Sequence, residues 1–156
     1  MIQKEVADRL TAIPGGKNSG AITHTVYYYA ISEEILTVPN TSFIPEPEVE
    51  SEVIKLTLRK EPPIKVADEK KFFALIKVAF MQRRKTLLNA ISNSSIGISK
   101  EEMEKVLQEL GIDSKIRGEA LTIEQFATIT NRIWNWTVPK NISFYAIHID
   151  FWRKKI

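Results

Sequence analysis

The chain has 156 residues, of which 44% are hydrophobic and 26% are charged, and its formal net charge is +3. This length suffices for one core, and no apolar stretch reaches the roughly 20 residues that a membrane-spanning helix needs. The absence of cysteine, with only two distant histidines at His24 and His148, excludes disulfides, thiolate chemistry and a structural metal site.

The first predicted element is an amphipathic helix over residues 1–11, in which apolar residues recur at every fourth position. The charged residues in this segment are not those of a signal peptide, so we expect a cytoplasmic protein. Residues 14–20 are rich in proline and glycine and predict a loop, whereas residues 21–30 favour a helix over a strand.

Two strands follow in the pattern. Residues 35–38 predict a short strand that Pro39 ends, and residues 53–59 predict a second one by strict alternation. Its apolar positions are Ile54, Leu56 and Leu58. We therefore expect one buried face and one basic face on this strand. The connection over residues 43–49 contains two prolines, which stiffen it and exclude regular ladder pairing.

After Pro62 and Pro63 the pattern becomes helical. Three predicted helix starts carry capping residues, which are Asp68, the pair Ser99 and Glu102, and the pair Thr122 and Gln125. Apolar stripes follow each of them at helical spacing. The sequence therefore predicts a small unit of about four helices over residues 61–134. Residues 135–156 form an aromatic and basic tail that this pattern does not explain.

Charge is distributed unevenly along the chain. Residues 1–54 hold three basic and eight acidic side chains, residues 55–100 hold eleven and three, and residues 101–156 hold eight of each. A local excess of positive charge is typical of surfaces that bind polyanions, because neutralised phosphates release counterions. The alternative interpretation is a solvated basic face without a partner.

Four segments, in order and at their separations, resemble the C-terminal half of the small-subunit (16S) rRNA adenine dimethyltransferase family. They are residues 1–10, residues 38–51 from Val38-Pro39 to Glu50-Ser51, residues 80–87 with Phe-Met-Gln-Arg-Arg-Lys-Thr-Leu, and Leu110-Gly111-Ile112-Asp113 followed by Arg117. The third segment is the most specific of the four. The match spans roughly residues 1–134.

The resemblance implies an α+β fold. Residues 1–60 would be the terminal strands and helices of a Rossmann-like methyltransferase sheet, and residues 61–134 a small all-α lobe that binds rRNA. The tail over residues 135–156 has no counterpart in the family pattern. An incomplete sheet exposes an edge and an apolar face, so we also expect self-association into a homo-oligomer.

The family methylates two neighbouring adenines of small-subunit rRNA with S-adenosylmethionine. Its glycine-rich donor loop and its Asn-Leu-Pro-Tyr segment do not occur in this sequence. The resemblance therefore implies a chain that binds small-subunit rRNA or a pre-ribosomal particle, binds no donor by itself and is inactive alone. The alternatives are a non-catalytic rRNA-binding module and a degraded gene remnant without function.

In the sheet portion, the resemblance places Phe43 beside the target base, where its ring would stack on an unpaired adenine. Pro45 and Pro47 would fix the loop that carries it. The alternative is a phenylalanine that anchors the core or the loop. The chain departs from the family pattern at Ser19, where an aromatic residue is usual, and at Glu48, where a basic residue is common. We therefore expect less RNA contact at the Pro-Gly loop.

In the helical portion, the resemblance assigns rRNA binding to Gln82, Arg83, Arg84 and Lys85. Successive helical residues point about 100° apart, so about two of the four would contact phosphates. Arginine suits this role because its planar fork can bind two phosphate oxygens. The alternative is a charged helix end with one arginine paired to Glu61 or Asp68.

Overall fold

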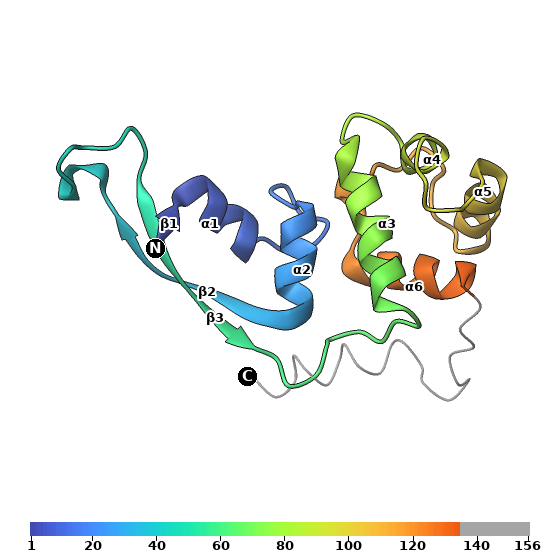
Figure 1. The fold of residues 1–156 in the computed structure, drawn as a ribbon, viewed down its shortest axis with the longest axis horizontal. Coiled ribbons are helices and arrows are strands. Elements are labelled where there is room, and N and C mark those ends of the chain that lie inside the picture. Colours follow the sequence, from blue (N-terminus) through green and yellow to red (C-terminus); the bar gives the residue numbers. More distant parts are fainter. Residues whose placement is uncertain (135–156) are drawn as a thin grey trace.

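The computed structural model describes residues 1–134, and the predicted tail over residues 135–156 lies outside this range. The first elements along the chain are β1 (Ile2–Gln3), α1 (Lys4–Thr11), α2 (Ala21–Tyr29), β2 (Ala30–Val38), the 3-10 turn η1 (Asn40–Ser42) and β3 (Ser51–Leu58). The three strands form one antiparallel sheet in the order β1-β3-β2. Helices α1 and α2 lie beside this sheet, and the β2–β3 hairpin projects away from the rest of the molecule (Figure 1).

From residue 69 to residue 133 the regular elements are all helical. They are α3 (Glu69–Met81), α4 (Leu87–Ser92), α5 (Lys100–Glu109), the 3-10 turn η2 (Gly118–Ala120) and α6 (Ile123–Ile133). The predicted caps are confirmed: the Asp68 side chain accepts from the third residue of α3, and both predicted capping boxes form at α5 and α6. Within the described residues, no helix has the length and apolar character needed to cross a bilayer.

The hydrophobic core lies mainly among these later helices. Its largest fully buried side chains include Phe72, Leu75, Leu107, Phe126 and Ile129. Of the earlier elements, α2 contributes Tyr28 to this cluster, and the ring of Tyr28 packs 5.6 Å from that of Phe72. Packing between α2 and α3 therefore joins the sheet side of the molecule to the helical side (Figure 1).

The first predicted helix is shorter than expected. Residues 2 and 3 are paired with Glu52 and Ser51 as strand β1, and α1 begins at Lys4. The four-residue spacing could not separate these residues from the helix, because the pairing partner lies about 50 positions further along the chain. The predicted helix over residues 21–30 is confirmed as α2.

Strand β2 is longer than the sequence pattern predicted, because it begins at Ala30 rather than at residue 35. Its first half pairs with β3, and a register shift between Glu34 and Leu36 lets both halves stay in the ladder. Two acidic residues in this half weaken the strand signal in the sequence. One of them, Glu33, lies opposite Lys55 and forms an ion pair at 3.5 Å.

The prediction that β3 buries one whole face is wrong for the second half of the strand. Leu56 is 47% and Leu58 is 79% exposed, whereas Glu52, further along the same face, is 3% exposed. Helix α1 covers only the part of the sheet that holds Glu52 of β3 and Glu34 of β2. Lys4 contacts the Glu52 carboxylate there, and Thr11 contacts the Glu34 carboxylate. A helix of eight residues is about 12 Å long and cannot cover the whole strand.

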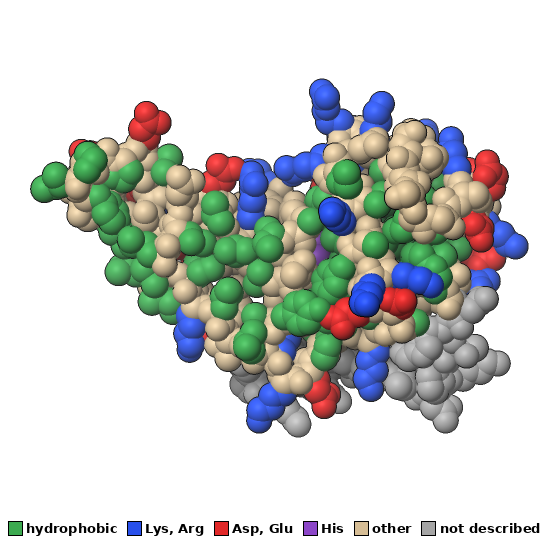
Figure 2. Space-filling view, viewed as in Figure 1, with side chains coloured by type: hydrophobic (Ala, Val, Ile, Leu, Met, Phe, Trp, Pro, Cys, Tyr) green, Lys and Arg blue, Asp and Glu red, His purple; other side chains and the backbone are tan. Residues whose placement is uncertain are grey.

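The sheet side of the molecule therefore exposes many large apolar side chains. On the two long strands and their connection these are Ile31, Ile35, Leu36, Ile44, Val49, Leu56 and Leu58. Figure 2 shows hydrophobic side chains spread over this part of the surface. Patches of this kind mark surfaces that meet other molecules. The expected self-association stays a prediction.

Candidate nucleic-acid interface

A basic turn follows α3. Helix α3 ends at Met81, and the Lys85 amide donates to the Gln82 carbonyl at 2.8 Å. Arg83, Arg84 and Lys85 are exposed, whereas Gln82 is half-buried. The expectation of helical spacing is therefore wrong, because these residues form a turn. We call residues 82–85 the basic turn; basic side chains project from this end of α3 in Figure 2.

The basic turn is held against the segment before η2. Thr86 and Arg117 form a β-bridge, and the Leu87 amide donates to the Ile116 carbonyl at 2.8 Å. Gly118 then packs directly on α3, since a Cβ atom at this position would lie 2.7 Å from the Ala79 Cβ. This close approach adds Arg117, which is exposed, to the three basic residues of the turn.

One arginine of the basic turn has an acidic partner, but it is not one of the two considered from the sequence. The Arg83 guanidinium lies 3.5 Å from the Glu119 carboxylate, rather than beside Glu61 or Asp68. Within residues 1–134, neither Arg84 nor Lys85 forms an ion pair. Their charges are therefore available to a ligand such as a phosphate.

The second predicted group lies on the connection between β2 and β3. Phe43 is half-buried and outside the core cluster, and its amide donates to the Asn40 carbonyl at 3.2 Å. Pro45 follows a cis peptide bond and is exposed, and Pro47 is half-buried. This loop lies at the projecting end of the hairpin, across α1 and α2 from the basic turn (Figure 1). The structure therefore brings the two predicted groups into separate regions.

The Pro-Gly loop before α2 is fixed from within. Ser19 is buried; its hydroxyl accepts from the Gly15 amide at 3.2 Å and lies 3.3 Å from Nε2 of His24. Burial lowers the pKa of His24 to about 4, so its ring is neutral near pH 7. The ring packs edge-on against Phe126 and beside Phe80. A lone histidine in the sequence gave no signal of this anchoring role.

The described residues do not form a site for a methyl donor such as S-adenosylmethionine. Such a site needs a strand followed by a glycine-rich turn and a helix. Here β1 runs directly into α1, and the glycines at positions 15, 16 and 20 lie between two helices. The described residues therefore do not provide this arrangement of strand, glycine-rich turn and helix.

The fold of this chain is similar to that of two solved transferase structures. A dimethyladenosine transferase from Plasmodium falciparum aligns with a TM-score of 0.68 and 21% identity over 85% of this chain and 55% of its own. The 23S rRNA methyltransferase ErmE aligns with a TM-score of 0.57 and 19% identity over 84% of this chain and 52% of its own. At these identities the likeness concerns the fold alone.

The sequence itself identifies the family: the chain belongs to the ribosomal RNA adenine dimethylase family, whose profile matches residues 1–135. Among curated relatives, the ribosomal RNA small subunit methyltransferase A of Geobacillus sp. (strain WCH70) is 49% identical over 135 residues. That of Geobacillus kaustophilus (strain HTA426) is 50% identical over the same length. Each alignment covers 85% of this chain and 46% of the relative, so the chain spans about half the length of these relatives.

Proposed function

We propose that this chain is the RNA-holding, C-terminal portion of an S-adenosylmethionine-dependent rRNA (adenine-N6,N6)-dimethyltransferase that acts on small-subunit rRNA. In this proposal residues 1–60 complete a Rossmann-like methyltransferase sheet, and residues 61–134 form the lobe that binds the RNA. The observation that carries the proposal is the basic turn after α3, which presents unpaired cationic side chains in a chain of this family.

The chemistry of the basic turn suits the backbone of a folded RNA. Arg84 and Lys85 are exposed and have no carboxylate partner among the described residues, and Arg117 is held beside them. Phosphate binding by such side chains gives affinity without reading the sequence, so it positions the RNA rather than selecting a base. The backbone carbonyl of Gln82 stabilises the turn by accepting the hydrogen bond from the Lys85 amide.

The hairpin loop would meet the target nucleotide. In this part of the proposal Phe43 stacks on the adenine, and Pro45 and Pro47 restrict the loop. Stacking of one base on an aromatic ring contributes roughly 1–3 kcal/mol. We therefore expect Phe43→Ala to weaken binding of a small-subunit rRNA fragment by this amount, while Ile44→Ala, on the neighbouring and fully exposed residue, leaves it nearly unchanged.

The RNA proposal is tested by the salt dependence of binding. Fluorescence anisotropy with a labelled small-subunit rRNA fragment would compare the wild type with the double variant Arg84→Ala, Lys85→Ala. If both side chains contact phosphates, the negative slope of log affinity against log salt concentration is shallower in the double variant by about two. The matched control is Lys100→Ala with Lys105→Ala, which removes two exposed charges on α5. Equal slopes for both double variants would refute the proposed interface.

Catalysis is tested by methyl transfer from radiolabelled S-adenosylmethionine to small-subunit rRNA. By itself the chain should transfer no methyl group, because residues 1–134 do not fit the donor. Transfer by the purified chain would overturn this part of the proposal. A second candidate function, a binding module without catalysis, is favoured by the same lack of a donor loop. This candidate predicts that the chain binds RNA, and that no methyl transfer occurs even when a protein that binds S-adenosylmethionine is added.

A further inference from the structure

Helix α3 turns one face away from the core. Its buried residues occupy one side and are Phe72, Leu75, Ile76 and Ala79. Successive helical residues point about 100° apart, so the residues on the opposite side are Lys70, Ala74, Lys77 and Met81. We call these four residues the outer face of α3. Both lysines are exposed, and Met81 is 72% exposed. The outer face therefore presents two cations to the solvent.

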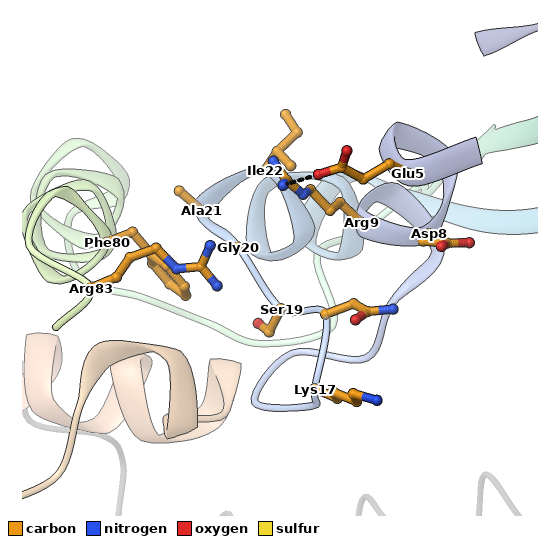
Figure 3. A pocket seen from close by; sticks show the side chains of 11 residues that line it. Glu5, Asp8, Arg9, Lys17, Ser19, Gly20, Ala21, Ile22, Phe80 and Arg83 are labelled. Atoms are coloured by element: carbon orange, nitrogen blue, oxygen red, sulfur yellow. Dashed lines mark hydrogen bonds and ion pairs between the residues drawn. The ribbon is translucent and has the colours of Figure 1, made fainter. Parts of the chain in front are cut away.

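Other contacts occupy the two flanks of α3. On one flank, Phe80 and Arg83 point toward the Pro-Gly loop and the start of α2, in the pocket that Figure 3 shows. On the other flank, Nζ of Lys71 lies 5.1 Å from the centre of a ring of Trp134. Arg83 and Lys71 therefore have neighbours of their own, and neither belongs to the outer face.

The two lysines of the outer face have no acidic partner in the described part of the chain. Neither Lys70 nor Lys77 forms an ion pair there. The two acidic residues at the start of α3 have other roles, since Asp68 caps the helix and Glu69 accepts a hydrogen bond from the Tyr29 hydroxyl. No acidic residue follows Glu69 within α3. Both lysines are therefore free to meet an anionic ligand.

The stability of the helix does not account for Lys70. It is the second residue of α3, where amides without an acceptor give the helix end a positive partial charge. A cation at this position opposes that charge, whereas an acidic residue such as Glu69 stabilises the helix end. An anionic ligand bound at Lys70 would interact favourably with both positive charges.

The outer face leads directly into the basic turn. Lys70 and Lys77 are seven positions apart, which places their Cα atoms about 10 Å apart along the helix axis. The basic turn begins immediately after Met81, and Arg84 and Lys85 are exposed there. Basic side chains lie over α3 on the face of the molecule that Figure 2 shows. The cations thus form a row along α3 rather than a compact cluster, which suits a linear polyanion because each cation can neutralise a different phosphate.

We propose that the outer face of α3 is a second contact surface for the RNA backbone, on which the RNA held at the basic turn continues along α3 past Lys77 to Lys70. This inference rests on the proposed function, whose phosphate contacts lie at the basic turn. It gives the bound RNA a direction on the molecule, because the phosphates follow the helix axis from its C-terminal end toward its N-terminal end.

The first test measures the salt dependence of binding by fluorescence anisotropy with the labelled small-subunit rRNA fragment. Lys70→Ala with Lys77→Ala should make the negative slope of log affinity against log salt concentration shallower by about two. The matched control, Lys100→Ala with Lys105→Ala, removes two exposed charges from α5 and should leave the slope unchanged. A slope equal to that of the wild type in the outer-face double variant would overturn the proposal.

A second test separates an RNA contact from a structural role of Lys70. Lys70→Gln keeps a polar side chain and removes the charge that opposes the helix end. We expect weaker RNA binding together with an unchanged or higher thermal midpoint. A midpoint that falls with no loss of RNA affinity would show that Lys70 serves the fold, and would overturn its assignment as an RNA contact.

A third test locates the RNA on the helix. The sequence contains no cysteine, so Ala74→Cys can carry a single iron-EDTA probe between the two lysines of the outer face. Gln108→Cys, at an exposed position of α5, carries the same probe as a control. Hydroxyl radicals from position 74 should cleave the bound rRNA fragment, and those from position 108 should cleave it far less. Equal cleavage from both positions, or none from position 74, would refute the proposed path.

These outcomes distinguish the inference from the proposed function. If the double variant of the basic turn changes the salt slope and that of the outer face does not, the RNA leaves the molecule at the turn. The inference is then wrong, and the proposed function stands. If the wild type binds no small-subunit rRNA, both are wrong.

Discussion

Acid should destabilise this protein through one side chain. His24 is fully buried, its Nδ1 has no hydrogen-bond partner among the described residues, and the rings of Phe80 and Phe126 pack against it. Protonation would place a positive charge in this apolar setting. Burial therefore lowers the pKa of His24 to about 4, from an ordinary value of 6.5.

The direction of the effect follows from this difference. Because the folded-state pKa lies below the unfolded-state pKa, the unfolded chain binds the proton first as the pH falls. The stability contributed by neutral His24 is fully present above pH 6.5 and is lost as the pH falls from 6.5 through 4. The shift corresponds to a total of about 3 kcal/mol, of which about 2 kcal/mol is lost between pH 7 and pH 5.

Urea unfolding followed by circular dichroism at pH 7, 6 and 5 would measure this loss. The control is His24→Gln, which keeps a polar side chain beside Ser19 but cannot titrate in this range. The wild type should lose about 2 kcal/mol more than the variant between pH 7 and pH 5. Parallel pH profiles of the two proteins, or an NMR titration that places the His24 pKa at 6.5 or above, would refute the reasoning.

Three further predictions concern packing and capping. Gly118→Ala should cost about 1–3 kcal/mol of unfolding free energy, because the new methyl would lie 2.7 Å from the Ala79 Cβ; an unchanged urea midpoint would contradict this packing. Ser99→Ala should cost about 1 kcal/mol by removing the cap of α5, measured as a lower thermal midpoint. Asn131→Ala should cost about 1–3 kcal/mol, because the Asn131 amide group bonds the backbone of residues 65–67 at 2.8 and 3.1 Å; equal proteolysis of that segment in both proteins would argue against it.

Local signals in the sequence were sufficient to predict where α3, α5 and α6 begin. Ser99 and Glu102 predict the start of α5 because a capping box is formed by residues three positions apart. The first half of β2 could not be found in this way. Glu33 and Glu34 are poor strand residues, and they enter the ladder because β3 lies beside them and Lys55 pairs with Glu33. Pairing with β3 therefore imposes a strand conformation on residues whose local propensity disfavours it.

The candidate interface shows the same limit. The motif over residues 82–85 identified a basic segment, but its turn conformation depends on Ile116 and Arg117, which approach from a later segment.

The uneven placement of the core has a consequence for hydrogen exchange. Of the buried hydrophobic residues in the described part of the chain, only Ala7, Tyr28 and Ala30 precede residue 59. Amides of α3 and α6 should therefore exchange only through global unfolding, while those of the outer hairpin exchange through local openings that require little free energy. A molecule that binds the hairpin would suppress these local openings, so at short labelling times the loss of deuterium uptake would appear in the hairpin. The helices open only globally and take up little deuterium at such times with or without the partner, so deuterium uptake would map where a partner binds.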